Sequence, residues 1–318
     1  MTLNRIPTIV MVGSAMVDLV TRVPRLPVGG ETLVGSSFDI GFGGKGSNQA
    51  VMAARLGAKV SVIAKLGQDV FGEQLLENYC KQNIDTTHVS FAEGSSGVAP
   101  ITVDEESGQN IVVIVPGANN HLSVQDVGAA ESTIRAADIL IGQLEIPMQT
   151  TLAAFEIAHR HGVTTLLNPA PAAELPDALW HATDILVPNE IEAAQLTNQN
   201  VANTEEAIKA ARALQSCGPK QVVVTLGSQG AVVLDADNNA HYLEAHKVKA
   251  VDTTGAGDAF VGSLAYFLGL DYSLANAAER AGAVATLSVQ KAGTQTSYPS
   301  AAEVVEAGAT KSSRVGKK

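Results

Sequence analysis

The sequence predicts an α/β fold, in which a doubly wound, mostly parallel sheet has helices on both faces and a small antiparallel β-sheet forms a lid. Short continuous apolar runs, such as residues 8–13, are typical of strands buried on both faces. From Ser123 onward, such runs alternate with segments of helical periodicity, as in doubly wound folds. Successive predicted strands end in polar residues, which favours a functional site along the carboxyl edge of the sheet.

A chain of 318 residues can form one large α/β domain or two smaller ones, and we expect a single domain over residues 1–318. Hydrophobic residues make up 46% of the chain, which is enough for an aliphatic core, and the formal charge of −11 disfavours nucleic acid as a partner. There are only two cysteines, no apolar run of membrane-spanning length and no signal-peptide pattern, so we expect a cytoplasmic protein with no membrane partner. The small, basic tail 308–318 is predicted to be disordered.

The first predicted strand, residues 8–13, leads into a polar turn that contains Asp18. A carboxylate that follows a buried strand is well placed to contact a ligand, although Asp is also an ordinary turn residue. Two segments then interrupt the alternation of strands and helices. Residues 17–42 and 98–115 combine period-two patterns with prolines and glycines, and we expect them to pair as the lid.

A glycine-rich stretch, Gly43-Gly44-Lys45-Gly46-Ser47-Asn48, opens a predicted helix that ends before Gly57. Lys45 and Asn48 lie at the start of this helix, where hydroxyl-rich or anionic ligands can be held. The stretch is similar to a dinucleotide fingerprint, but it follows an antiparallel segment rather than the first buried strand. This context argues against a Rossmann dehydrogenase.

The rest of the chain alternates between strands and helices. Asp69 and Ser123 have the positions of helix N-caps, and Glu145 closes a strand. The predicted strands are 59–66, 139–145, 163–167, 184–187 and 221–225, and the later predicted helices include 204–215 and 273–289.

The stretch 251–260 predicts a phosphoryl-transfer site. Gly255, Ala256 and Gly257 leave the backbone bare immediately before a helix, whose N-terminal N–H groups attract an anion. Asp258 in the first turn is then placed to take a proton from an attacking hydroxyl. The alternative interpretation is an ordinary turn followed by a helix charge that complements the dipole.

Together, in this order, the two glycine-rich stretches resemble the signature pair of the ribokinase-like carbohydrate and purine kinase family. The resemblance extends over roughly residues 6–307, because four further motifs occur in the same order. They are Gly-Ser-x-x-x-Asp, Gln-Leu-Glu, Asn-Pro-Ala-Pro-Ala and Pro-Asn-Glu. The resemblance implies transfer of the γ-phosphoryl group of ATP to the primary hydroxyl of D-ribose, giving ribose 5-phosphate and ADP. It also implies Asp258 as the general base and residues 255–257 as the anion hole.

The resemblance further implies three sets of binding residues. The sugar would be held by Asp18, Gly44, Lys45, Asn48, Glu145 and Asp258, with Ala99, Ile101 and Ile114 either covering it or merely packing the lid. ATP and Mg²⁺ would be held by Asn189, Glu192, Thr225, Gly227, Gly230, Gly257 and Gly282. A K⁺ ion would be held by Asp252, Thr254, Ser288, Lys291, Gly293 and Ser297, unless Asp252 only caps its own turn.

The resemblance also implies a homodimer formed through the lid, since pairing would hide its sheet edges and apolar face. Gly282 stands where the family often has Asn or His beside the adenine, which leaves the contacts to adenine open. Thr296 stands where the family often has Pro. Two alternatives remain at this stage. One is a sibling kinase acting on 2-deoxyribose, fructose or a nucleoside, and the other is a catalytically silent sugar- or nucleotide-binding protein.

Overall fold

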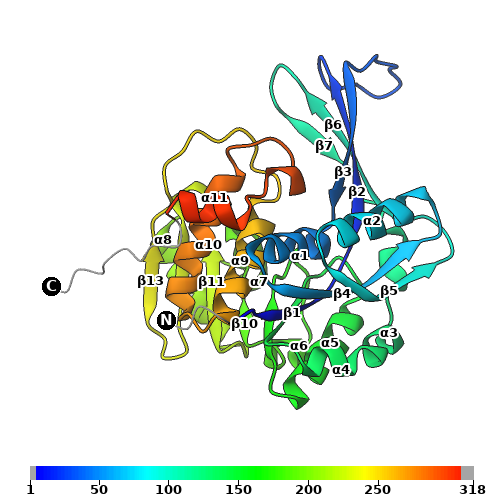
Figure 1. Ribbon diagram of the computed structural model, residues 1–318. Helices are drawn as coiled ribbons and strands as arrows, with labels where there is room; N and C mark the ends of the chain where they lie inside the picture. The colour runs from blue at the N-terminus through cyan, green and yellow to red at the C-terminus, as the bar shows by residue number, and fades with distance from the viewer. Residues whose placement is uncertain (1–4, 309–318) are drawn as a thin grey trace.

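The computed structural model describes residues 5–308, so all but the first residue of the predicted disordered tail lies outside the described part of the chain. Its main feature is a nine-stranded sheet (Figure 1). In sheet order the strands are β13 (Ala240–Leu243), β12 (Ala231–Leu234), β11 (Gln221–Thr225), β10 (Ile185–Leu186), β9 (Thr164–Leu167), β8 (Ile139–Gly142), β1 (Thr8–Val12), β4 (Lys59–Gly67) and β5 (Asp85–Ala92). Neighbours from β11 to β5 pair in parallel, and the β11–β12–β13 edge is antiparallel.

Helices cover both faces of this sheet, as predicted. The central strand β1 is apolar on both sides, with Ile9 and Met11 in one core and Val10 and Val12 in the other. The first core is completed by α1 (Lys45–Leu56), α2 (Val70–Lys81), α9 (Ala256–Gly269), α10 (Leu274–Ser288) and α11 (Ala301–Glu306). The second is completed by α3 (Val124–Ala129), α4 (Glu131–Arg135), α5 (Met148–Arg160), α6 (Asp177–His181), α7 (Glu190–Thr197) and α8 (Thr204–Gln215).

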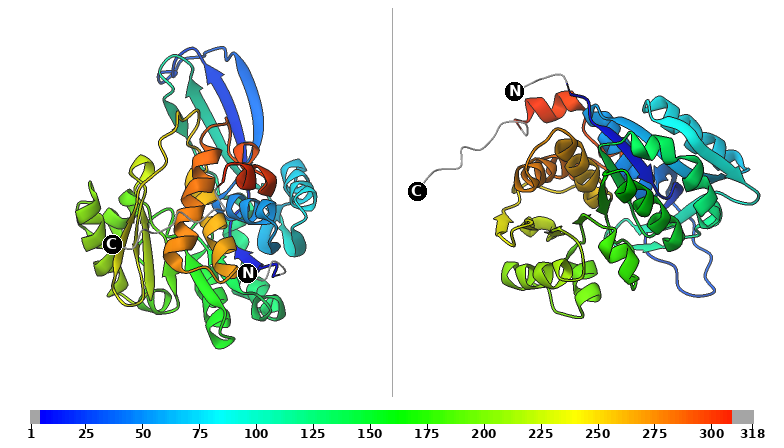
Figure 2. Two further views of the ribbon diagram at one scale, coloured as in Figure 1. Left: turned by 60° about the vertical axis from the view of Figure 1, so that its left-hand side comes forward. Right: turned by 90° about the horizontal axis from the view of Figure 1, so that it is seen from below.

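A second, four-stranded sheet projects from this body (Figures 1 and 2). Its strands, in order, are β3 (Ser37–Gly43), β2 (Met16–Val23), β6 (Gly97–Asp104) and β7 (Asn110–Val112). The two predicted lid segments do pair, but the sheet is mixed rather than antiparallel throughout, because β2 and β6 run parallel over eight residues. This parallel pairing is possible because β6 returns to β2 after the long excursion through α1, β4, α2 and β5.

Local signals in the sequence fix many of the element ends. Asp69 accepts a hydrogen bond from the Gly72 N–H at the start of α2, and Ser123 forms a capping box at the start of α3. Gly57 ends α1 in the left-handed conformation, with a φ of 104°. Short one-turn 3₁₀ helices occupy Gly117–His121, Gly227–Gln229 and Gln295–Ser297.

The structure also differs from the sequence-based expectation at several elements. Two strand segments were not anticipated: β5, and the hairpin formed by β12 and β13 at the opposite edge of the sheet. The strand predicted at 139–145 is shorter and ends at Gly142, which leaves Glu145 in the following loop. Within residues 5–308, no helix is long and apolar enough to cross a membrane.

Candidate active site

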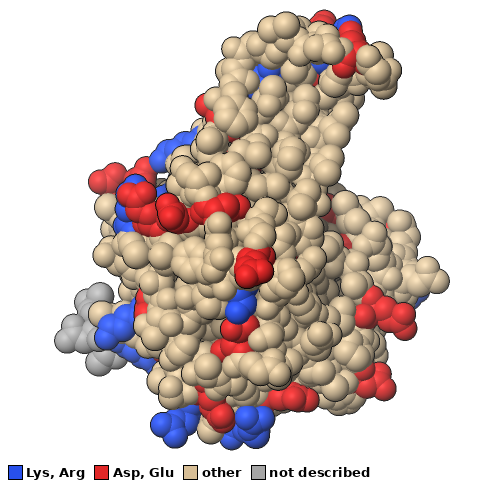
Figure 3. All heavy atoms as spheres, turned by 90° about the vertical axis from the view of Figure 1, so that its right-hand side faces the viewer, with Lys and Arg blue, Asp and Glu red and all other residues tan. Residues whose placement is uncertain are grey.

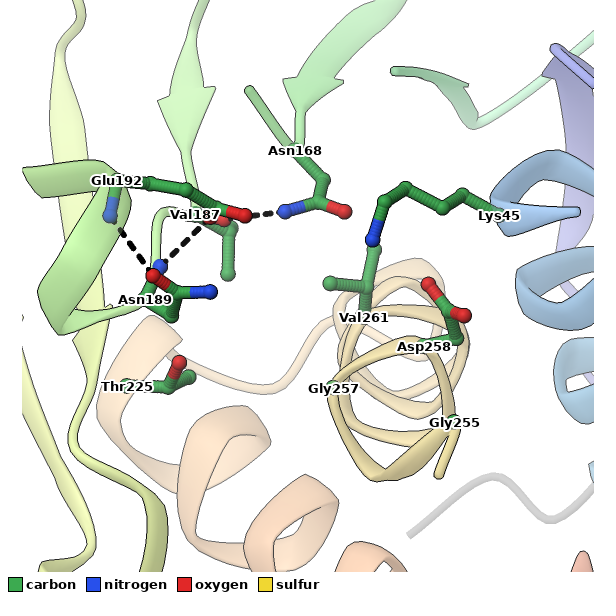
Figure 4. Close-up of a pocket in the computed structure, with 10 residues that line it drawn as sticks. All are labelled: Lys45, Asn168, Val187, Asn189, Glu192, Thr225, Gly255, Gly257, Asp258 and Val261. Carbon is green, nitrogen blue, oxygen red and sulfur yellow. Dashed lines mark hydrogen bonds between the residues drawn. The ribbon is translucent and has the colours of Figure 1, made fainter. Parts of the chain in front are cut away.

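The predicted base and most of the predicted nucleotide residues line one cleft (Figure 4). The cleft lies where β9, β10 and β11 end and where α1, α7 and α9 begin. This is the carboxyl edge of parallel strands, where open α/β sheets bind ligands. The residues that line it are Lys45, Asn168, Val187, Asn189, Glu192, Thr225, Gly255, Gly257, Asp258 and Val261.

The N-terminus of α9 is shaped as an anion site. Its N-cap, Gly255, has a φ of 76°, and an added Cβ would lie 2.5 Å from Cγ2 of Thr294 and 2.8 Å from the hydroxyl of Tyr298. No side chain of the described residues caps this helix. The Ala256 N–H donates to the Thr253 carbonyl at 3.2 Å, and the N–H groups of Gly257 and Asp258 are available to a ligand. A Cβ added at Gly257 would meet nothing within 4 Å, which shows that the space above the helix end is open.

Asp258 is buried in the first turn of α9, with 8% of its surface exposed. The Asn48 amide donates to Oδ2 of Asp258 at 2.9 Å, and the Gln49 amide donates to Oδ1 at 3.0 Å. Each carboxylate oxygen therefore has one neutral donor and keeps a lone pair. A carboxylate held in this way is suited to accept a proton from a bound hydroxyl.

The side chain of Lys45 extends from α1 into the cleft, on the side of Asn168 and Asp258 (Figure 4). Burial disfavours its charge, but the carboxylates of Asp258, Glu145 and Glu192 outweigh burial and raise the pKa of the ammonium. The cleft thus holds a permanent cation close to the N-terminus of α9. The charged end of Lys45 therefore lies near carboxylates of both predicted sets, Asp258 and Glu145 of the sugar site and Glu192 of the nucleotide site.

Glu145 is anchored to the start of α1 rather than free in a loop. Its Oε2 accepts hydrogen bonds from the hydroxyl of Ser14 at 2.5 Å and from the backbone N–H of Lys45 at 2.9 Å. The N-cap of α1 is Gly44, whose φ is 84° and whose added Cβ would lie 2.8 Å from the Met16 nitrogen. Glu145, Gly44 and Lys45 are therefore neighbours, as the sugar-site prediction requires.

Asp18 lies inside β2, not beyond the end of β1 as the sequence suggested, because only three residues separate the two strands. Burial, followed by the nearby carboxylates of Glu145 and Asp258, raises the pKa of Asp18 to about 6. An added Cβ at Gly43 would lie 2.3 Å from Oδ1 of Asp18. The missing side chain at Gly43 therefore makes the room that Asp18 occupies.

The projecting sheet places two predicted apolar contacts beside Asp18. Asp18 pairs with Ala99, and Ile101 follows two residues later on β6, so all three lie on one face of the sheet. Ala99 is buried, whereas Ile114 is 52% exposed. The sheet thus contributes both a carboxylate and apolar surface to the same side of the site.

Asn189 and Glu192 form a capping box at the start of α7 (Figure 4). Oδ1 of Asn189 accepts from the Glu192 N–H at 2.8 Å, and Oε2 of Glu192 accepts from the Asn189 N–H at 2.8 Å. The amide nitrogen of Asn189 and the other oxygen of Glu192 remain for a ligand. Burial is the main cause that raises the pKa of Glu192 above its ordinary value.

Of the remaining predicted nucleotide residues, Thr225 lines the cleft, whereas Gly227, Gly230 and Gly282 are not among its lining residues. Thr225 forms an isolated bridge with Asn189. The turn after β11 contains Gly227 and Gly230, with φ values of 52° and 105°, and an added Cβ at Gly230 would lie 1.9 Å from the Leu243 carbonyl oxygen. A Cβ added at Gly282 on α10 would meet nothing within 4 Å, so the space beside this residue is open.

Asp252 connects the two loops of the predicted cation site. Its Oδ1 accepts from the Thr254 N–H and its Oδ2 from the Gly293 N–H, both at 2.9 Å. Burial acts to raise the pKa of Asp252, but these N–H groups outweigh it and the pKa is lowered. Other predicted ligands have partners as well: the Ser288 carbonyl accepts from the Lys291 N–H, Lys291 pairs with Glu303, and Ser297 donates to the Thr294 carbonyl.

Comparison with known proteins identifies the family. The model of the pfkB family carbohydrate kinases matches residues 7–301. The chain belongs to the pfkB family of carbohydrate kinases.

Relatives of this kinase include a mouse ribokinase, which is 46% identical and aligns over 92% of this chain and 91% of its own length. A deoxyribokinase from Salmonella typhi is 41% identical, over 92% of this chain and 95% of its own length. Among solved structures, the Arabidopsis thaliana ribokinase complexed with ribose and ATP matches with a TM-score of 0.87 and 29% identity. That match covers 95% of this chain and 99% of the Arabidopsis chain.

Three polar residues of the kinase site had no role in the sequence-based prediction. Ser14 bonds Glu145, Asn168 lines the cleft, and Gln49 bonds Asp258. Ser14 and Asn168 each follow a strand of the parallel sheet, which is a usable sequence signal. Gln49 directly follows the glycine-rich stretch, but nothing in the sequence shows that its side chain turns toward α9.

Proposed function

We propose that this carbohydrate kinase transfers the γ-phosphoryl group of ATP to the primary hydroxyl of D-ribose, with Asp258 as the general base. The observation that carries the proposal is the position of Asp258. It lies in the first turn of the uncapped helix α9, close enough to Asp18 to act on its pKa, and it lines the same cleft as Asn189 and Glu192. The resemblance to relatives named ribokinase, one of them complexed with ribose and ATP, supports the choice of substrates.

In the proposed reaction, the sugar hydroxyl oxygen forms a bond to the γ-phosphorus while the bond between this phosphorus and the β–γ bridging oxygen breaks. The hydroxyl proton passes to the Asp258 carboxylate, and ADP leaves with the bonding electron pair. The N–H groups at residues 255–257 and the ammonium of Lys45 face the charge on the transferred group. Phosphoryl transfer needs positioning and charge neutralisation above all, which fits a site made of placed donors.

On the sugar side, the proposed partners are Asp18, Glu145, Asn48 and the backbone of the Gly44–Lys45 turn. A sugar presents donors and acceptors in every direction, so a dry pocket must pair each hydroxyl. Ala99, Ile101 and Ile114 would cover its apolar side as the projecting sheet closes over it, which makes this sheet a lid.

On the nucleotide side, we propose that Thr225 and Asn189 contact the phosphates of ATP. The rest of ATP would lie against the turn at Gly227 and Gly230 and against the open surface at Gly282. Glu192 fits Mg²⁺, because one free carboxylate oxygen suffices for an ion that keeps most of its waters, and the free amide nitrogen of Asn189 can donate to a phosphate oxygen beside it. Mg²⁺ bound there would neutralise charge on the phosphates.

The oxygen-rich loops at Asp252 fit a monovalent cation. The proposed K⁺ ligands are the Asp252 carboxylate, the carbonyls of Thr254, Ser288, Lys291 and Gly293, and the Ser297 hydroxyl. Asp252 already connects both loops, and its lowered pKa keeps it ionised. A cation there would stiffen the turn that leads into the anion site.

A second candidate substrate is 2-deoxyribose, because a deoxyribokinase is 41% identical, close to the 46% of the mouse ribokinase. The test is a coupled assay of ADP release with D-ribose or 2-deoxyribose as the acceptor. We expect a higher kcat/KM with D-ribose. A higher kcat/KM with 2-deoxyribose would assign this chain to the sibling activity.

We also propose a homodimer formed through the projecting sheet. Charged groups lie mainly near its tip on the face in Figure 3, and the sheet exposes several large apolar side chains. Those on its strands and in the segment after β7 are Phe38, Ile40, Ile111, Val112, Val113, Ile114 and Val115. Pairing with a second copy would cover this surface.

The free, exposed thiols of Cys80 and Cys217 fit a reducing, cytoplasmic location.

A further inference from the structure

The geometry points to Gln49 as a positioning residue, which fixes the orientation of the Asp258 carboxylate for proton transfer. This inference rests on the proposed role of Asp258 as the base. Gln49 is fully buried on α1, with 0% of its surface exposed, so its own role must be exerted through its neighbours. Its side chain reaches across to α9 and to the end of β9.

The Gln49 side chain makes three hydrogen bonds, two through its amide nitrogen and one through its amide oxygen. Its amide nitrogen donates to Oδ1 of Asp258 and to Oδ1 of Asn168, both at 3.0 Å. Its amide oxygen accepts from the Gln143 amide at 2.6 Å. With one acceptor bond and two donor bonds, the amide plane of Gln49 has a single favourable orientation.

The two helices are packed closely enough for this short connection. Gly262 lies one turn after Asp258 on α9, and an added Cβ there would lie 2.4 Å from the Gln49 carbonyl oxygen and 3.0 Å from Cβ of Met52. The backbones of α1 and α9 are therefore nearly in contact beside the base. The absence of a side chain at Gly262 sets the distance that the Gln49 side chain spans.

A single donor would leave the Asp258 carboxylate free to turn about its Cβ–Cγ bond. Asn48 holds Oδ2 and Gln49 holds Oδ1, so the two neighbours on α1 fix the plane of the carboxylate between them. The two have separate roles in our proposal, because Asn48 also belongs to the sugar site and Gln49 does not. The lone pairs that remain on Asp258 then face the substrate in one orientation only, which favours a productive geometry.

The competing explanation is that Gln49 only satisfies buried polar groups and stabilises the fold. Gln49→Met, which keeps the shape and removes the polar atoms, separates the two explanations. We expect kcat to fall about 10- to 100-fold, with KM for ribose and ATP changing by less than about threefold. Thr165→Val is the matched control. Thr165 is also fully buried and donates to the Ala182 carbonyl, but it lies at the other end of β9.

The deciding comparison is a double-mutant cycle with Asp258→Asn, in which Gln49→Met should add little further loss of kcat. Full, multiplicative loss in the double variant would overturn the proposal. If Gln49→Met folds poorly, Gly262→Ala displaces α1 from α9 while keeping the amide, and its loss of kcat should show the same dependence on Asp258.

A crystal structure of Gln49→Met gives a readout that does not depend on which sugar is phosphorylated. We expect the Asp258 carboxylate to be rotated or to occupy two orientations, and to be unchanged in Thr165→Val. An unchanged Asp258 together with wild-type kcat would refute the positioning role. In contrast, a wild-type protein that phosphorylates neither sugar, combined with a rotated Asp258 in the variant, would count against the proposed function and not against Gln49.

Discussion

Replacing Asp18 by Asn should stabilise the free protein and weaken its binding of sugar. Folding raises the pKa of the Asp18 carboxyl from 3.8 to about 6, chiefly through burial. Above pH 6 Asp18 is ionised in both the folded and the unfolded chain. Ionisation is less favourable in the folded protein, so it lowers the free energy of unfolding. Since one pKa unit corresponds to about 1.4 kcal/mol, this costs about 3 kcal/mol of stability at most at neutral pH.

The sign of the pH dependence follows from the same shift. The Asp18 contribution to the free energy of unfolding should fall as the pH rises from 3.8 to about 6 and be constant above that. Urea unfolding of wild type and Asp18→Asn at pH 7.5 and at pH 4 measures it, and the advantage of the variant should shrink at pH 4. Asp39→Asn is the control, because Asp39 is exposed on the neighbouring strand β3. Equal stability of wild type and Asp18→Asn at pH 7.5 would refute the reasoning.

The same substitution should raise KM for ribose. A lost hydrogen bond to a buried partner costs about 1–3 kcal/mol, or roughly a 5- to 150-fold change in affinity. KM for ATP should change little, because Asp18 lies on the projecting sheet and is not among the residues lining the cleft. A stabilised variant that binds ribose as wild type does would remove Asp18 from the sugar site.

Three further predictions concern the ions and the assembly. Activity should be higher in K⁺ than in Na⁺ at constant ionic strength, and Asp252→Ala should abolish this difference; a wild type indifferent to the ion would show that no cation site exists there. Glu192→Gln should raise the Mg²⁺ concentration needed for half-maximal rate, by about tenfold, with KM for ribose nearly unchanged. Sedimentation at micromolar concentration should show a dimer, and Phe38→Asp should shift it toward monomer; a fully active wild-type monomer would contradict the proposed interface.

The sequence predicted the elements whose ends carry a local chemical signal. The helix over residues 204–215 and the strand over 221–225 have the predicted bounds, and the segment after Gly255 is a helix that begins at Ala256. For the two helices, glycine and an apolar period of 3.6 residues were sufficient to predict the element, because both signals act within one or two helical turns. The edge strand β5 and the hairpin β12–β13 were missed, because β5 mixes polar and apolar residues and β12 and β13 have only four residues each.

The site was predicted as a set of residues but not as a set of contacts. Asn48 remains a proposed sugar contact, but the sequence did not show its protein contacts. Its amide nitrogen donates to Asp258, and its oxygen accepts from Gln295, which lies in a loop nearly 250 residues away. The Gln295 amide therefore joins the predicted cation loop to the residues around the base. The resemblance assigned Lys45 to the sugar site, and the structure shows that its long side chain also reaches into the cleft lined by predicted nucleotide residues. Side-chain direction of this kind is decided by tertiary packing, which local sequence does not encode.

The most direct test of the proposed mechanism is kcat of Asp258→Asn with D-ribose and ATP. The amide keeps the size and the burial of Asp258 but cannot accept the proton, so we expect kcat to fall by about 10²- to 10⁴-fold while KM for ribose stays nearly unchanged. The measurement requires that circular dichroism and thermal unfolding of the variant match wild type. A folded Asp258→Asn enzyme within a few-fold of wild-type kcat would contradict the assignment of Asp258 as the general base.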